Sequence, residues 1–221
     1  MGLRLPALLL CLALAAGLAS SSSAGPARLG RLKYGGGGDW YANPTALPNL
    51  IAALRDRVGV LVDSKVETVA LTDRRLFDFA ALFVTGHGRI AFTAAEAAVL
   101  RDYLQHGGFL HVDDNYGMDE SFRQAVKVLF PHDELVEIPF GHPVYHCVYD
   151  FPNGLPKIHE HHGGPPRGYG ILHEGRLVLF YSYNTDLNDG WESPGVHNDP
   201  PEAREAALRM GINIVTYALS H

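Results

Sequence analysis

The stretch GGFLHVDD, residues 107–114, decides the fold that we expect. A helical pattern ends at Gly107, a short apolar run follows, and two adjacent carboxylates, Asp113 and Asp114, stand where that run stops. This is how a parallel strand of an open α/β sheet delivers polar groups to a site, because ligands bind beyond the carboxyl ends of such strands. The stretch therefore predicts both a buried strand and a site at its end.

A second apolar run, residues 80–85, ends in Gly86, His87 and Gly88. The flanking glycines give the imidazole room and favour exposure at a strand end over packing in the core. If the two strands are neighbours, His87 and one of Asp113 or Asp114 would reach a common point, where they are the candidate catalytic acid and base. The alternative for both aspartates is structural, since carboxylates also cap turns and bind loop N–H groups.

The N-terminus predicts export. Arg4, an apolar run and small residues near position 24 form a signal peptide over residues 1–24, followed by a spacer at 25–32. An uncleaved anchor is the alternative, but the apolar run is shorter than the ~20 residues of a membrane span. We expect a periplasmic or secreted protein whose residues 33–221 form a single domain. Cys147 would be its one cysteine, without a disulfide, and most simply a small buried residue.

Charge limits the partners. The formal net charge of -6 and the absence of any run of Lys or Arg argue against nucleic acid and anionic lipid. A small polar ligand and an envelope protein remain as expected partners.

The first half of the chain alternates strands with helices. An apolar stripe of helical spacing begins after Pro44, and Thr93 with Glu96 forms a capping box for a later helix. This order predicts an α/β fold of three layers, a mainly parallel sheet with helices on both faces. We expect strands at 32–34, 66–71, 80–85 and 107–114, helices at 43–58, 93–107 and 119–131, and a connection at 73–79 that turns Phe77 and Phe79 inward.

The second half loses this alternation. Residues 132–173 hold seven of the twelve histidines with several Gly and Pro, so we expect a long irregular excursion over the edge of the site. A β-hairpin of residues 170–172 and 176–182 follows, then a loop, and a C-terminal helix at 200–219 closes the domain.

Histidine density in this excursion suggests a divalent metal ion as the possible cofactor. His159 and His161 share a face if their segment is extended, and His142 and His146 share one if theirs is helical. Neither a C-x-x-C nor an H-E-x-x-H pattern supports a known zinc class. The four histidines are therefore predicted metal ligands on composition alone.

A ligand site is expected around the same sheet edge. Four glycines at 35–38 can bring backbone N–H groups close to an anion, although a flexible turn explains them equally well. Trp40, Tyr41 and Trp191 would cover the ligand as an aromatic lid. The predicted ligand-binding residues are Gly36, Gly37, Asp39, Trp40, Gly86, Gly88, Tyr183, Asn184, Asp186 and Trp191.

Five motifs in order carry a family resemblance: YGGGGDWY, TGHG, GGFLHVDD, HPVYHCVYD and YSYNTD with a following Trp. Together they resemble the bacterial family called domain of unknown function 4159, over nearly the whole mature chain. The resemblance implies a flavodoxin-like sheet of the class I glutamine amidotransferase-like kind. Some members are fused to membrane-anchored modules of aerotolerance-type systems.

One departure from true amidotransferases bears on activity. Those enzymes place a nucleophilic Cys on a strand-to-helix elbow, where this chain has Gly86, His87 and Gly88. We therefore expect a cell-envelope module that binds a small molecule or a metal. The alternative is a hydrolase or isomerase of a small polar, carbohydrate-like substrate that uses His87 with Asp113 or Asp114; fold alone does not decide between them.

Overall fold

The structure, a computed structural model, describes residues 25–159 and 161–221. The expected signal peptide lies outside the described residues. Within the described part of the chain, no helix has the length and apolar character that a membrane crossing requires.

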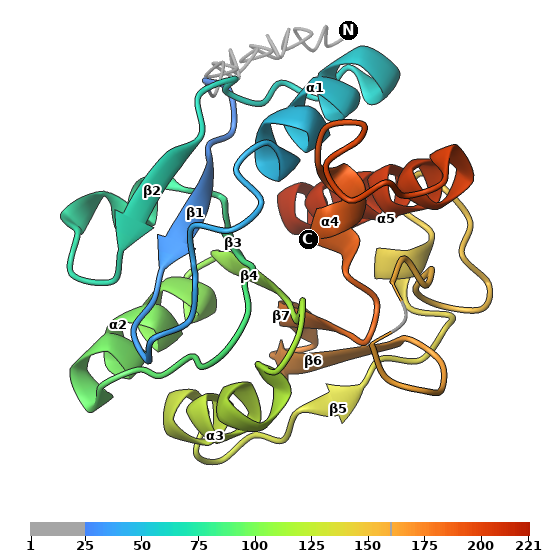
Figure 1. Ribbon diagram of the computed structural model, residues 1–221. Coiled ribbons are helices and arrows are strands. Elements are labelled where there is room, and N and C mark those ends of the chain that lie inside the picture. Colours follow the sequence, from blue (N-terminus) through green and yellow to red (C-terminus); the bar gives the residue numbers. More distant parts are fainter. Residues whose placement is uncertain (1–24, 160) are drawn as a thin grey trace, which may run out of the picture.

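One mixed sheet organises the described residues (Figure 1). Its strands are β1 (Leu29–Lys33), β2 (Glu67–Ala70), β3 (Ala81–Val84), β4 (Phe109–Asp113), β5 (Val136–Glu137), β6 (Arg167–His173) and β7 (Arg176–Tyr183). They follow the order β2-β1-β3-β4-β7-β6-β5. The first five strands of this order run parallel, and β6 and β5 add an antiparallel edge. The mainly parallel α/β prediction is confirmed.

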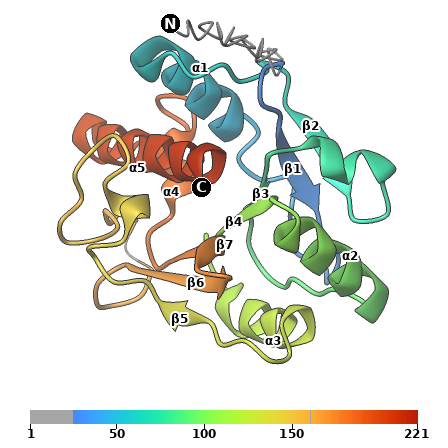
Figure 2. The same ribbon diagram turned by 180° about the vertical axis from the view of Figure 1, so that it is seen from behind.

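Helices cover both faces of the sheet, as Figures 1 and 2 show. The helices are α1 (Ala46–Val58), α2 (Ala94–Gln105), α3 (Asp119–Leu129), α4 (Leu187–Trp191) and α5 (Pro201–Ser220), with 3-10 helices η1 (Arg74–Asp78) and η2 (Pro143–Tyr145). α1, α4 and α5 pack on one face, and α2 and α3 on the other. The fold therefore has three layers.

Side-chain alternation along the central strands divides the core into two halves. In β4, Phe109 faces the α1 and α5 side while Leu110 faces the α2 and α3 side. His111 also turns toward the first side, where its ring stacks on Phe180. The strand is buried along its whole length, as a central parallel strand requires.

The sequence signals that predict the start and the end of α2 are present in the structure. The Thr93 hydroxyl accepts the Glu96 N–H, and the Glu96 carboxylate accepts the Thr93 N–H, so the predicted capping box is present. The helix ends at Gln105, and Gly107 follows with φ +103°. A glycine takes that left-handed conformation without the steric cost that a Cβ would bring.

Several expectations about local structure were wrong, and β1 begins at Leu29, inside the predicted spacer of residues 25–32. Phe77 is 52% exposed, because residues 74–78 form a 3-10 helix that places its ring at the surface against Tyr103, and only Phe79 is buried. Strand β6 begins at Arg167, three residues before the predicted hairpin, and β5 pairs with it inside the supposed irregular excursion. The loop that carries Asp189 and Trp191 is the short helix α4.

Candidate metal site

The carboxyl ends of strands β3, β4 and β7 bring polar residues to one edge of the sheet. Register pairs Val84 with Val112 and Asp113 with Ser182, so these three strands finish nearly level. The polar side chains at these strand ends and just beyond them are buried, which is unusual for polar residues and shows that they are shielded from water. They are Thr85, Asp113, Asp114, Asn115, Asn184, Thr185 and Asp186.

Asp113 joins β4 to the start of α4. Its carboxylate accepts hydrogen bonds from the Ser182 hydroxyl and from Asn188, through the backbone N–H at 2.8 Å and the side-chain amide at 3.2 Å. Complete burial raises the pKa of Asp113 to about 6, although these hydrogen bonds act in the opposite direction. The structure thus gives this predicted catalytic residue a structural set of partners.

Asp114 has a structural environment too. It accepts the Met118 N–H at 3.0 Å, just before α3, and the Tyr181 hydroxyl at 3.3 Å. Burial raises its pKa. The two aspartates point to opposite sides, as alternation along a strand requires, and neither has a hydrogen bond to His87 among the described residues.

His87 pairs with Asp39 instead. The ring Nδ1 lies 3.1 Å from Asp39 Oδ2, and the other Asp39 oxygen accepts the His87 backbone N–H. The His87 side chain is 50% exposed, which agrees with the expected exposure at a strand end. His87 and Asp39 are each predicted site residues, but no local feature of the sequence indicates that they pair.

The glycine-rich loop makes this pairing possible. Gly38 and Asp39 donate backbone hydrogen bonds to Arg89 and His87, so the loop pairs with the segment that follows β3. A Cβ on Gly36 would lie 2.7 Å from Ala91 N, and one on Gly86 would lie 2.7 Å from Asp39 Oδ1. These glycines permit a close approach of two loops, so the N–H groups of Gly38 and Asp39 serve the protein itself.

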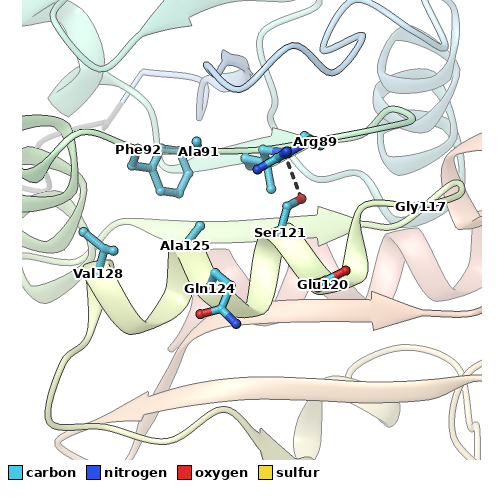
Figure 3. A pocket seen from close by; sticks show the side chains of 10 residues that line it. Arg89, Ala91, Phe92, Gly117, Glu120, Ser121, Gln124, Ala125 and Val128 are labelled. Carbon is cyan, nitrogen blue, oxygen red and sulfur yellow. Dashed lines mark hydrogen bonds between the residues drawn. The ribbon is translucent and has the colours of Figure 1, made fainter.

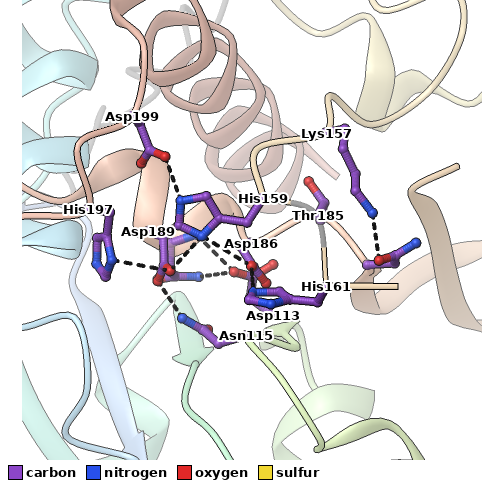
Figure 4. A network of polar contacts seen from close by, with 12 residues as sticks. Asp113, Asn115, Lys157, His159, His161, Thr185, Asp186, Asp189, His197 and Asp199 are labelled. Atoms are coloured by element: carbon purple, nitrogen blue, oxygen red, sulfur yellow. Dashed lines mark hydrogen bonds and ion pairs between the residues drawn. The ribbon is translucent and has the colours of Figure 1, made fainter. Parts of the chain in front are cut away.

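Asp186 is the centre of the polar cluster (Figure 4). It follows β7 with φ +62°, a left-handed conformation that turns its carboxylate inward, and it is fully buried. Neither oxygen has a hydrogen-bond partner among the described residues, although His161 Nε2 touches Oδ2. Burial first, and then the charges of Asp113 and Asp189, raises the pKa of Asp186 to about 9.

Two histidines reach Asp186 from the excursion. The backbone N–H groups of Ile158 and His159 bond to the Thr185 carbonyl, which fixes this segment along the end of β7. His159 Nδ1 lies 3.4 Å from Asp186 Oδ2. One donor atom each from His159, His161 and Asp186 all lie within 4.8 Å of one another, a geometry that suits a single ion.

An outer layer of polar groups surrounds His159. Asp199 Oδ1 lies 2.5 Å from the second ring nitrogen of His159, and Asp189 Oδ2 lies 3.2 Å from the first. The other oxygen of Asp189 accepts the side-chain amides of Asn43 and Asn115 at 2.6 and 2.5 Å. Metal-binding histidines commonly have such a carboxylate on the nitrogen that does not face the ion.

Sequence reasoning missed several members of this outer layer, namely Asp189, His197, Asp199, Asn43 and Asn115. His197 Nδ1 lies 3.6 Å from Asp189 Oδ2, and its Nε2 is buried without a hydrogen-bond partner in the described chain. Asp189 could have been found from its spacing to Asp186, because residues three apart lie on one face of a helical turn.

The other two predicted metal ligands lie elsewhere. His142 and His146 flank η2, which packs on α5. The His142 ring packs on Tyr217, while both nitrogens of His146 are engaged, by Asp150 at 2.5 Å and the Phe140 carbonyl at 2.7 Å. The four histidines thus form two separate pairs, and only the pair at 159 and 161 meets a buried carboxylate.

The expected aromatic lid is not assembled from the three predicted rings. Trp191 is fully buried and donates its indole N–H to Ala207. Trp40 lies under Lys33 and Tyr41 is exposed. Tyr183 and Asn184 are near the cluster: Tyr183 stacks with His162, and Asn184 accepts a 2.6 Å hydrogen bond from Lys157.

A separate pocket of about 350 Å³ lies between residues 89–92 and α3 (Figure 3). The Ile90 N–H donates to the Ser121 hydroxyl there at 3.1 Å. Its lining includes Arg89 and Glu120 but no member of the Asp186 cluster. The pocket and the cluster are therefore distinct features.

Fold and site together define an α/β protein with a histidine and carboxylate cluster at the carboxyl edge of its sheet. The chain belongs to the family described as Domain of unknown function (DUF4159), whose model matches residues 28–219. No curated protein matches the chain.

Proposed function

We propose that this protein is a metal-binding module that holds one divalent ion through His159, His161 and Asp186. The observation that carries the proposal is the convergence of their donor atoms within 4.8 Å at a buried carboxylate, which has no hydrogen-bond partner among the described residues and contacts only these two histidines there. A histidine nitrogen and a carboxylate oxygen that touch need a proton or a metal ion between them. A metal ion accounts for all three residues at once.

The charge balance of the cluster supports a cation. Asp113 and Asp189 are buried close enough to Asp186 to raise its pKa, and apart from His159 and His197 beside Asp189, their described hydrogen-bond donors are neutral hydroxyl, amide and backbone groups. Lys157 contributes one positive charge nearby. Buried carboxylates are normally paired or bound to metals, because an unpaired buried charge is costly.

Zinc is the ion that we propose first. Two imidazoles and one carboxylate are a ligand set of catalytic zinc sites, which keep a fourth position for water or a ligand. The same set also suits Fe²⁺. The side chains of His159 and His161 are 23% and 32% exposed, so the fourth position would face solvent on their side.

The scaffold is proposed to be flavodoxin-like and amidotransferase-like, without the nucleophilic cysteine. The order β2-β1-β3-β4-β7 supports a flavodoxin-like scaffold, because it corresponds to the flavodoxin-like order 2-1-3-4-5 with β7 as the fifth strand. Cys147 lies after η2, far along the chain from the β3 end that carries His87. We further propose export to the cell envelope, on the strength of the N-terminal sequence alone.

Zinc titration by calorimetry, with metal analysis of protein purified without an affinity tag, tests the site. We expect one equivalent of Zn²⁺ in the wild type and at least a tenfold loss of affinity in His161→Ala and Asp186→Asn. His146→Ala is the matched control, because that histidine also contacts an aspartate but lies outside the cluster. Equal affinity in all four proteins would remove the site assignment.

A further inference from the structure

We propose that His87 and Asp39 form the proton-transfer pair of a metal-assisted hydrolase, which acts on uncharged carboxylic esters or amides at the proposed metal site. This inference rests on the proposed metal function and goes beyond it. His87 would be the catalytic residue that exchanges protons with water, and Asp39 its positioning residue.

The geometry of the pair suits a general base. Asp39 binds His87 twice, at the ring Nδ1 and at the backbone N–H, so both the orientation and the tautomer of the imidazole are fixed. With Nδ1 facing a carboxylate, the ring presents Nε2 outward from a half-exposed side chain. A base oriented by a third group in this way recurs in hydrolytic sites.

The loop carrying the pair is held next to the metal ligands. His87 forms a β-bridge with Tyr116, and the Gly88 N–H donates to the Tyr116 carbonyl at 3.2 Å. The Tyr116 ring in turn lies 5.1 Å from the ring of His161, centre to centre. One residue therefore separates the backbone of His87 from a proposed metal ligand.

The loops that carry Asp39 and His87 pack closely against each other, which fixes the position of the pair. A Cβ on Gly86 would meet both the Tyr34 hydroxyl and Asp39, and Gly86 has φ +135°. A Cβ on Gly38 would lie 2.8 Å from the His87 carbonyl oxygen. The two loops can approach this closely only because glycine occupies both positions.

The chemical step needs only water and the substrate. His87 Nε2 takes a proton from a water molecule that the ion would activate, and the oxygen of that water forms a bond to the substrate carbonyl carbon. The bond from that carbon to the alcohol or amine then breaks, and the leaving group takes the proton from His87. One water is consumed, an acid and an alcohol or amine are released, and nothing is oxidised or reduced.

The negative charge around the proposed metal site indicates which class of substrate it would accept. Asp113, Asp114 and Asp189 lie close enough to Asp186 to raise its pKa, Asp199 contacts His159, and a divalent ion would offset only part of the charge of these carboxylates. A phosphate or other polyanion would be repelled by the remainder. An uncharged ester or amide avoids this repulsion, and the ion polarises its carbonyl oxygen.

The test uses 4-nitrophenyl acetate with the zinc-loaded protein, and zinc binding is measured separately by calorimetry. We expect zinc-dependent hydrolysis above that of free Zn²⁺, a roughly 100-fold lower kcat in His87→Ala and His87→Gln, and zinc affinity within twofold of wild type. Asp39→Asn should lower kcat about tenfold at unchanged KM. His106→Ala is the control, since His106 is also an exposed histidine paired with an aspartate, Asp102, at 3.0 Å.

Each alternative result is decisive. Full activity in both His87 variants, or zinc binding without hydrolysis, overturns this inference and leaves the metal-binding function standing. Preferential hydrolysis of 4-nitrophenyl phosphate overturns the substrate class. Failure to bind zinc removes both the proposed function and this inference.

Discussion

Asp199 Oδ1 lies 2.5 Å from His159 Nε2, while the other nitrogen of the same ring faces Asp186. A carboxylate in this position fixes the ring orientation and makes the opposite nitrogen a better ligand. The segment before α5 thereby supports a ligand on the excursion, forty residues earlier in the chain.

Asp199→Asn should therefore weaken zinc binding by about 10- to 100-fold with the three proposed ligands still present. Calorimetric titration measures the change. Asp150→Asn is a close control, because Asp150 makes a contact of the same length, 2.5 Å, with His146 outside the cluster. Equal losses in the two variants would show that the contact at His159 has no special role.

Asp113 should matter for stability. Replacement by Ala leaves the Ser182 hydroxyl and two Asn188 donors without their acceptor, so we expect the free energy of unfolding to fall by about 1–3 kcal/mol or more. Urea unfolding measures this, with the exposed Asp56→Ala as control. Unchanged stability together with lost ligand binding would return Asp113 to the catalytic role that the sequence suggested.

The buried His111 should make the folded protein less stable in acid. Its ring is buried, its Nδ1 has no hydrogen-bond partner among the described residues, and burial lowers its pKa to about 3 from 6.5. Between those values the unfolded chain binds a proton that the native chain excludes, so stability falls as pH drops below 6.5. The wild type should lose about 2 kcal/mol from this residue between pH 7.5 and pH 5.

His111→Phe removes the titrating group and keeps a flat ring beside Phe180 and Trp191. The difference in unfolding free energy between the two pH values, measured in urea, should be smaller in the variant by that amount. An identical acid loss in both proteins would mean that other groups account for it.

Gly37 and Gly86 both have positive φ. Replacing each by Ala distinguishes the cost of backbone strain from the cost of crowding by neighbouring atoms. Gly37→Ala places a Cβ in open space and should cost about 1–2 kcal/mol for the left-handed backbone alone. Gly86→Ala adds contacts of 2.6 and 2.7 Å with Tyr34 and Asp39, so it should cost more and displace the His87 pair. Thermal unfolding compares them, and equal costs would contradict the argument that the loops need this close approach.

The central fold was predictable because its signals are local. The run in β3 is continuously apolar, β4 is apolar at Phe109, Leu110 and Val112, and the Thr93 capping box marks the start of α2 without reference to any distant residue. Phe77 was misplaced because an aromatic residue in a short 3-10 helix carries no periodicity that distinguishes inside from outside. The short strand β5 depends on its pairing with β6, which a local pattern does not reveal.

The site was predictable only in part, for a similar reason. His159 and His161 are predicted metal ligands from extended alternation, whereas Asp186, which follows a strand, is predicted only among the ligand-binding residues. His197 and Asp199 reach the cluster from the loop before α5, and nothing in their local sequence points to it. The Asp39 partner of His87 likewise depends on a contact between loops 48 residues apart.

X-ray absorption at the zinc edge, on protein loaded with one equivalent of Zn²⁺, tests the central claim most directly. The account predicts two imidazole nitrogens and carboxylate or water oxygens around the ion in the wild type, and one imidazole in His161→Ala. An unchanged imidazole count in that variant, or a shell of oxygens alone in the wild type, would contradict a site built from His159, His161 and Asp186.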